Sequence, residues 1–190
     1  ARNSFILLYC SVALTGCLST KSYVDPRLPL VAKDDIPKPA TPAPVQILVE
    51  FQTKGTANAS ATSAVKPRVI AVASESGLFS GVSSTATDAE GGGVLKVLIN
   101  NTPVGSPGAK GFGTGLTLGA VGSMVTDNYV CTATYTRDET STVVEVEHQL
   151  HTTVGNKSGP EGLTAVTMQQ GIEQVLDQLI WNSLSQLSAK

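Results

Sequence analysis

YVCTATYTRDETSTVVEVEHQLHTTV, residues 129–154, is the stretch that decides the fold. Apolar and polar side chains alternate along 129–137 and again along 142–154, which is the two-residue period of a strand with one buried face. The polar DETS between the two runs is typical of a turn. The stretch therefore predicts a β-hairpin, whose apolar face needs a second layer to cover it.

The covering layer is predicted near the C-terminal end of the sequence. In LTAVTMQQGIEQVLDQLIWNSLSQL, residues 163–187, apolar side chains recur at helical spacing, and glutamine and acidic side chains occupy the opposite side. The apolar positions are Ile172, Val175, Leu176, Leu179, Ile180, Leu184 and Leu187. This pattern predicts a long amphipathic helix whose apolar stripe faces a sheet.

Four shorter segments complete the predicted domain, residues 45–190. VQILVEFQT (45–53), GLFSGVSS (77–84) and VLKVLIN (94–100) have the composition of strands. Residues 60–76 predict a helix that begins late, with Ser60 or Thr62 as its cap and Pro67 near its first turn. The expected fold class is α+β, with two layers. It has an antiparallel or mixed sheet of about five strands and two helices.

The first residues, ARNSFILLYCSVALTGC, have the composition of a secretory signal. Arg2 precedes an apolar run from Phe5 to Leu14, and Gly16 directly precedes Cys17. A signal peptide has an apolar region of about 7–15 residues, whereas a membrane-spanning helix needs about 20. Residues 1–16 are therefore predicted to be a signal peptide.

Leu14-Thr15-Gly16-Cys17 resembles the lipobox of bacterial envelope lipoproteins, which signal peptidase II processes. The resemblance implies cleavage between Gly16 and Cys17, a diacylglyceryl group on the Cys17 sulfur and an acyl group on the new amino terminus. No other cofactor is expected. Leu18, rather than aspartate, follows the cysteine, and in the enterobacterial sorting pattern this favours the periplasmic side of the outer membrane over the inner membrane. An ordinary signal peptide or a short core helix is the alternative interpretation.

Residues 17–44 are predicted to be the lipidated cysteine and a proline-rich tether. Six of the ten prolines fall here: Pro26, Pro29, Pro37, Pro39, Pro42 and Pro44. Such a composition favours extended conformations and does not fold alone, and at about 3.1 Å per residue it could reach about 80 Å. A proline-rich ligand for a partner's groove is the other possibility.

The glycine-rich stretch KGFGTGLTLGAVGSMVTD, residues 110–127, fits this plan poorly. Gly111, Gly115 and Gly119 are spaced by four, a pattern that permits close approach of helices in membranes, but the apolar span is shorter than the roughly 20 residues of a spanning helix. Two interpretations stay open. The stretch is a buried loop over the core, or it is an element for self-association or membrane contact. For the second, the candidate residues are Gly111, Gly115, Leu116, Leu118 and Gly119.

Signals for catalysis, metal binding and nucleic-acid binding are weak. The net charge of −2 gives no nucleic-acid footprint, and no phosphate-binding glycine loop is present. His148 and His151 are three apart on a predicted strand, so they face opposite sides and make a poor metal pair. A surface or edge position is expected for both. Cys131 is predicted to be a small core residue.

The sequence therefore favours a non-catalytic protein over an enzyme. The first expectation is a lipid-anchored envelope lipoprotein that acts as a subunit or accessory factor of a larger assembly, with a membrane, an envelope protein or further copies of itself as partners. The second is a carrier or transport auxiliary that holds a lipid or another apolar ligand between the sheet and the terminal helix. A lipid-anchored hydrolase is a weak third.

Overall fold

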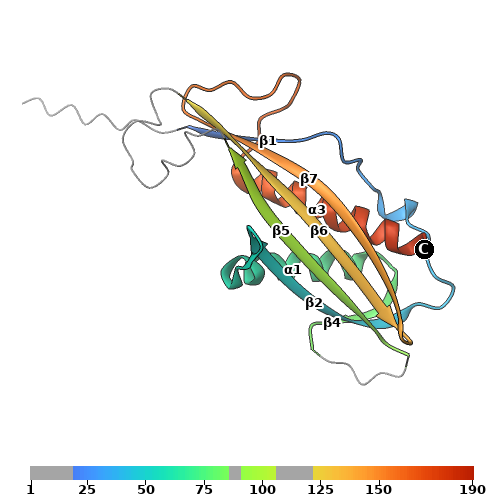
Figure 1. Cartoon of the computed structure of the whole chain (residues 1–190). Coiled ribbons are helices and arrows are strands. Elements are labelled where there is room, and N and C mark those ends of the chain that lie inside the picture. Colours follow the sequence, from blue (N-terminus) through green and yellow to red (C-terminus); the bar gives the residue numbers. More distant parts are fainter. Residues whose placement is uncertain (1–18, 86–90, 106–121) are drawn as a thin grey trace, which may run out of the picture.

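Seven strands form one mixed sheet in the part of the chain that the structure describes, which is residues 19–85, 91–105 and 122–190 of a computed structural model (Figure 1). The strands are β1 (Thr20–Val24), β2 (Ala43–Thr53), β3 (Thr56–Ala57), β4 (Phe79–Ser83), β5 (Gly93–Gly105), β6 (Ser123–Arg137) and β7 (Thr140–Val154). Their order is β1-β7-β6-β5-β2-β3, with β4 also paired to β2. The pairs of β2 with β4 and with β5 are parallel, and the other pairs are antiparallel.

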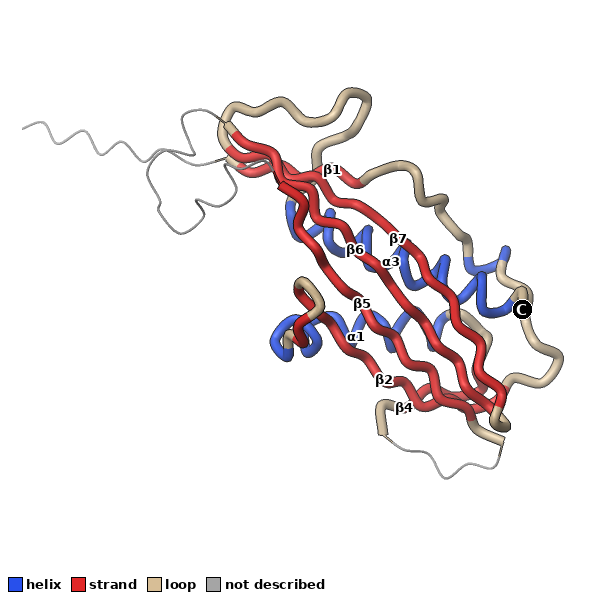
Figure 2. The backbone as a smooth tube through the Cα atoms, viewed as in Figure 1, coloured by secondary structure: helices blue, strands red, loops and turns tan. Residues whose placement is uncertain are grey.

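Two α-helices among the described residues, α1 (Ala59–Glu75) and α3 (Met168–Ser188), lie on the same face of this sheet (Figure 2). The predicted two-layer α+β class is therefore confirmed, and the predicted count of about five strands is too small. β1 and β3 are the strands that the pattern did not predict. β3 is a two-residue strand paired with the end of β2, too short to carry a period.

The helix boundaries follow from capping side chains. Asn58 caps α1 by accepting a hydrogen bond on its side chain from the Ala61 backbone N–H at 3.0 Å. The helix therefore begins earlier than predicted, and Pro67 lies inside it rather than near its first turn. In α3, Thr167 and Gln170 form a reciprocal capping box, which satisfies backbone donors that a helix start leaves free.

The core lies between the sheet and the two helices. Alternate residues of β2, β5, β6 and β7 face the helices, among them Ile47, Ile99, Cys131 and Val146, each less than 4% exposed. The helices contribute the following buried side chains: Val65, Val69 and Val72 from α1, and Val175, Leu179, Ile180 and Leu184 from α3. The predicted core position of Cys131 is confirmed, and burial raises the pKa of its thiol to about 11.

The predicted hairpin is confirmed, and it is longer than predicted. β6 and β7 pair without interruption from Ser123 opposite Val154 to Arg137 opposite Thr140. The turn is Asp138-Glu139, with φ of 48° and 63°. Positive φ at both central residues is the geometry of a two-residue turn that matches the twist of the strands.

The N-terminal segment contradicts the predicted tether. β1 adds to the outer side of β7, with Thr20 opposite Val154 and Val24 opposite Leu150. Within the described part of the chain, strand structure is therefore present from Thr20 onward, well before Val45, and the predicted boundary at Val45 is wrong. The physical reason is that β7 offers an unpaired backbone ladder, which an extended segment can complete whatever its own propensity.

Residues 25–42, here called the strap, follow β1 and contain the 3-10 helix η1 (Lys33–Asp35). Ile36 is 2% exposed, and Leu28 and Val31 pack against the core. The Asn182 side chain of α3 donates to the Pro29 carbonyl at 2.9 Å. The strap is therefore fixed to the domain rather than a free leash.

None of the helices in the described ranges is long and apolar enough to cross a membrane.

Candidate functional site

A tight turn follows β1 and places Asp25 at the edge of the sheet. One carboxylate oxygen of Asp25 accepts hydrogen bonds from the backbone N–H and from Nε of Arg27, both at 2.9 Å. Burial alone would raise the pKa of Asp25, but the hydrogen bonds and charge of Arg27, together with His151, outweigh it and lower that pKa. Asp25 is therefore a carboxylate held ionised in a nearly buried position.

The two histidines lie on opposite faces of β7, as predicted. The Nδ1 of His151 is 2.9 Å from the Thr126 hydroxyl, and its Nε2 is 3.5 Å from Asp25. Thr126 and His151 are direct cross-strand neighbours, so the register of β6 and β7 explains their contact.

The expected surface or edge position is wrong for His148. Its side chain points toward α3 and is 3% exposed, because the even-numbered residues of this part of β7 face the helices. Burial lowers the pKa of His148, against opposing effects of Gln178 and Asp25. Its Nε2 has no hydrogen-bond partner among the described residues.

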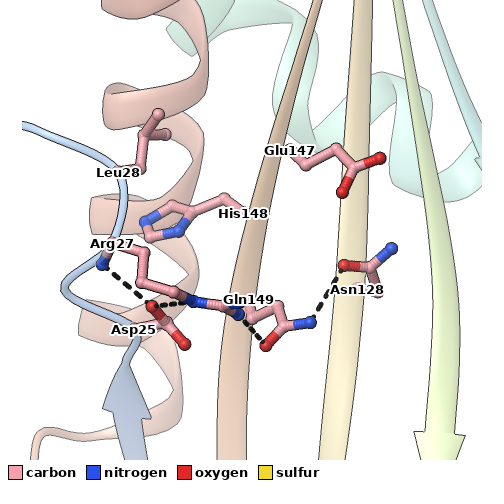
Figure 3. A pocket seen from close by; sticks show the side chains of 7 residues that line it. All are labelled: Asp25, Arg27, Leu28, Asn128, Glu147, His148 and Gln149. Carbon is pink, nitrogen blue, oxygen red and sulfur yellow. Dashed lines mark hydrogen bonds and ion pairs between the residues drawn. The ribbon is translucent and has the colours of Figure 1, made fainter.

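A pocket of about 180 Å³ lies where β1 ends and the strap begins (Figure 3). Its lining comes from the strap, from β6 and from β7, and consists of Asp25, Arg27, Leu28, Asn128, Glu147, His148 and Gln149. The side chain of Gln149 accepts a hydrogen bond from the guanidinium of Arg27 and donates one to the side-chain amide oxygen of Asn128. The Glu147 carboxylate has no such bond drawn to it and is exposed (Figure 3).

The pocket favours a cationic group over an anionic one. Asp25 and Glu147 each contribute a negative charge, Arg27 contributes one positive charge, and burial favours the neutral form of His148. The guanidinium of Arg27 is already engaged by Asp25 and Gln149. Among the described residues, no group of three or more His, Cys, Asp and Glu side chains could hold a metal ion.

The larger hollows lie on the helix side of the molecule. One of about 880 Å³ runs between α1 and α3 and is lined by apolar side chains, including Val65, Ile172 and Leu176, and by the ion pair of Arg68 with Asp177. Another, of about 280 Å³, lies between the end of the strap, Phe79, Tyr135 and the end of α3. The carrier interpretation predicts a ligand between the sheet and α3, but this space contains the buried core side chains of α3.

The site residues predicted from the sequence lie outside the described residues. This holds for Gly16 and Cys17 and for Gly111, Gly115, Leu116, Leu118 and Gly119. The flanking described residues show where these segments join the fold. Gly105 pairs with Val125, and Ser123 and Thr20 both pair with Val154, so both segments are attached at the same end of the sheet.

Comparison with known proteins shows no matching family model and no matching curated protein. Among solved structures, PelC of Paraburkholderia phytofirmans, determined as a dodecamer, matches 90% of this chain and 97% of its own at 13% identity, with a TM-score of 0.34. A putative neuraminyllactose-binding hemagglutinin homolog from Helicobacter pylori matches 85% of this chain and 90% of its own at 14% identity, with a TM-score of 0.40. Likenesses this distant carry no functional assignment.

Proposed function

We propose that this protein is a lipid-anchored, non-catalytic envelope lipoprotein that acts as a subunit or accessory factor of a larger assembly through protein–protein contacts. The observation that carries the proposal is the lipobox-like Leu14-Thr15-Gly16-Cys17 at the end of a signal-like apolar run. Its setting next to the fold adds support, because β1 begins at Thr20. Cleavage before Cys17 would leave the folded strands intact.

The short connection would hold the fold close to the bilayer. Three residues extend at most about 10 Å, so a lipidated Cys17 keeps the start of β1 near the membrane surface. The segment with Gly111, Gly115, Leu116, Leu118 and Gly119 joins the sheet at this same end, between Gly105 and Ser123. This placement favours membrane contact or self-association for the segment over a covering loop elsewhere. Leu18 after the cysteine favours the outer membrane.

A catalytic role has one structural argument for it, the contact of Asp25, His151 and Thr126. Thr126 and His151 are neighbours across β6 and β7, and the Asp25 carboxylate lies beside them. Neither Thr126 nor His151 lines the nearby pocket in which a substrate would have to bind. Asp25 also binds Arg27 through the other carboxylate oxygen. We therefore assign these groups a structural role, that of holding β1 and the strap to the sheet.

The carrier function remains the second candidate, and the hollow of about 880 Å³ between α1 and α3 favours it. Its apolar lining could accept an acyl chain beside the Arg68–Asp177 pair. A carrier predicts a monomer that purifies with lipid, whereas a subunit predicts a larger species.

Two measurements test the proposal. Cys17→Ser should release the protein from membranes and abolish its labelling with fatty acid, and a variant that still pellets and still labels would refute the lipobox interpretation. The wild-type protein is then extracted from its own membranes in mild detergent and sized. A species that contains other polypeptides or many copies supports the subunit, and a monomer with bound lipid supports the carrier.

A further inference from the structure

The N-terminal half of β7 forms an edge of the sheet that no other described strand covers. Within the described ranges, β1 covers the outer side of β7 over Leu150–Val154, and no strand pairs with that side over residues 143–147. In Figure 1, β7 borders the sheet beyond the end of β1. The edge of residues 143–147 is called the β7 edge below.

The backbone of this edge points outward at known positions. The Gln149 carbonyl accepts from the Asp25 N–H at 3.1 Å, and the Val143 carbonyl accepts from the Lys190 ammonium at 2.9 Å, both from the side away from β6. Because the backbone groups of successive strand residues alternate between the two sides, Glu145 and Glu147 also direct their N–H and C=O groups outward. An added strand would find these groups at the right spacing.

The side chains of the edge specify what kind of strand it can accept. Glu145 and Glu147 are exposed, and Val143 is 50% exposed. The pocket of Figure 3 lies at the end of the edge where β1 stops, with Glu147 on its rim and Leu28 and His148 in its lining. An aliphatic stem with a cationic head fits this combination, because the stem packs on apolar atoms while the charge stays near a carboxylate.

We propose that the β7 edge is a docking site for an extended polypeptide segment of a partner protein, one that carries Lys or Arg at alternate positions and adds to the sheet as a strand beyond β1. A second copy of this chain fits less well. Antiparallel pairing of two β7 edges about a two-fold axis would bring Glu145 and Glu147 against the same glutamates, and like charges opposite each other are destabilising. The inference deepens the proposed protein–protein role and rests on it for its biological setting.

The test uses the full chain in mild detergent and a short labelled peptide of alternating valine and lysine as the probe. We expect the peptide to bind and hydrogen exchange at the Glu145 and Glu147 amides to slow. The double variant Glu145→Lys, Glu147→Lys should lose at least about tenfold in affinity for this peptide, because two favourable cross-strand charge pairs become repulsive. It should gain affinity for a valine–glutamate peptide. Glu161→Lys, a charge change at an exposed loop residue, should leave binding unchanged.

A backbone control separates strand addition from charge attraction. The valine–lysine peptide with alternate N-methyl groups keeps its side chains and loses the donors that would face β7. The proposal is overturned if the methylated peptide binds as tightly as the unmethylated one, if Glu161→Lys loses as much peptide affinity as the double variant, or if the wild type does not bind the peptide. The methylated peptide is compared on wild-type protein, so the test does not depend on the folding of any variant.

A second copy of the chain on this edge is tested separately. Slow hydrogen exchange at the Glu145 and Glu147 amides in the protein without peptide, together with a dimer on sedimentation, would assign the edge to a second copy and overturn the proposal as well. None of these readouts requires lipidation, so a failed Cys17→Ser test and a failed peptide test are independent results.

Discussion

Replacing Ile36 by alanine tests whether the strap is part of the fold. Ile36 is 2% exposed, and it packs against the core from a segment whose composition is that of a free linker. Truncation of a buried isoleucine to alanine costs about 2–5 kcal/mol, and the cost is smaller where the site can collapse around the gap. For a strap at the margin of the core we expect about 2–3 kcal/mol. In a chain of this size that corresponds to a fall in melting temperature of about 5–10 °C.

Leu30 provides the matched control within the same strap, because its side chain is 80% exposed. Leu30→Ala should change the free energy of unfolding by less than about 0.5 kcal/mol. Both variants are compared with the wild type by urea unfolding and by thermal melting. If Ile36→Ala and Leu30→Ala were equally harmless, the strap would be a tether after all, and the reasoning from burial would be refuted.

Three further predictions follow from packing and ionisation. Gly171→Ala should destabilise the protein by about 1–3 kcal/mol in urea unfolding, because a Cβ there would lie 2.8 Å from a terminal methyl group of Leu150. A variant as stable as the wild type would show that the Leu150 side chain can move aside, and it would contradict this prediction. The pKa of His148 in the folded protein is lowered below its ordinary value of 6.5. The free energy of unfolding should therefore be highest above about pH 6.5 and should fall as the pH drops below that value. His148→Leu should flatten this dependence, and an unchanged pH profile would contradict the assignment. The Cys131 thiol, which is fully buried, should react with thiol reagents at the rate of unfolding, and rapid labelling of the folded protein would contradict its core position.

Segments with a clear period were predicted well, because in them local pattern and tertiary packing agree. The hairpin of β6 and β7 and the helix α3 each bury one face against the same core, so their side chains carry the two-residue or the helical period. β1 has no comparable pattern. Its five residues, TKSYV, become a strand because β7 offers them a ladder, and that information lies more than a hundred positions away in the sequence.

The candidate site was missed for a related reason. The pocket combines the strap with the middle of β6 and β7, and neither His148 nor Glu147 differs in local context from an ordinary strand residue. The signal that could have found one part of it is Asp25-Pro26-Arg27, because an aspartate before a proline favours a turn in which the carboxylate binds the following backbone. The predicted residues around Gly115 and at Cys17 stay predictions, since they lie outside the described residues.

Because β1 and the strap are part of the fold, a partner can contact this protein only within a limited distance of a lipid anchor at Cys17. A free tether of residues 17–44 would allow contacts as far as about 80 Å from the bilayer. Under the proposed lipidation of Cys17, the end of the sheet nearest the membrane is the end at Val154, because β1 starts at Thr20 opposite that residue. From there Glu147 is seven residues along β7 and Val143 is eleven, which is about 23 Å and about 36 Å at strand spacing. The three residues from Cys17 to Thr20 add at most about 10 Å, so a partner that uses the β7 edge of the lipid-anchored protein would have to present its extended segment within about 46 Å of the membrane, whatever the tilt of the sheet. That requirement favours another membrane-associated envelope protein over one that diffuses freely.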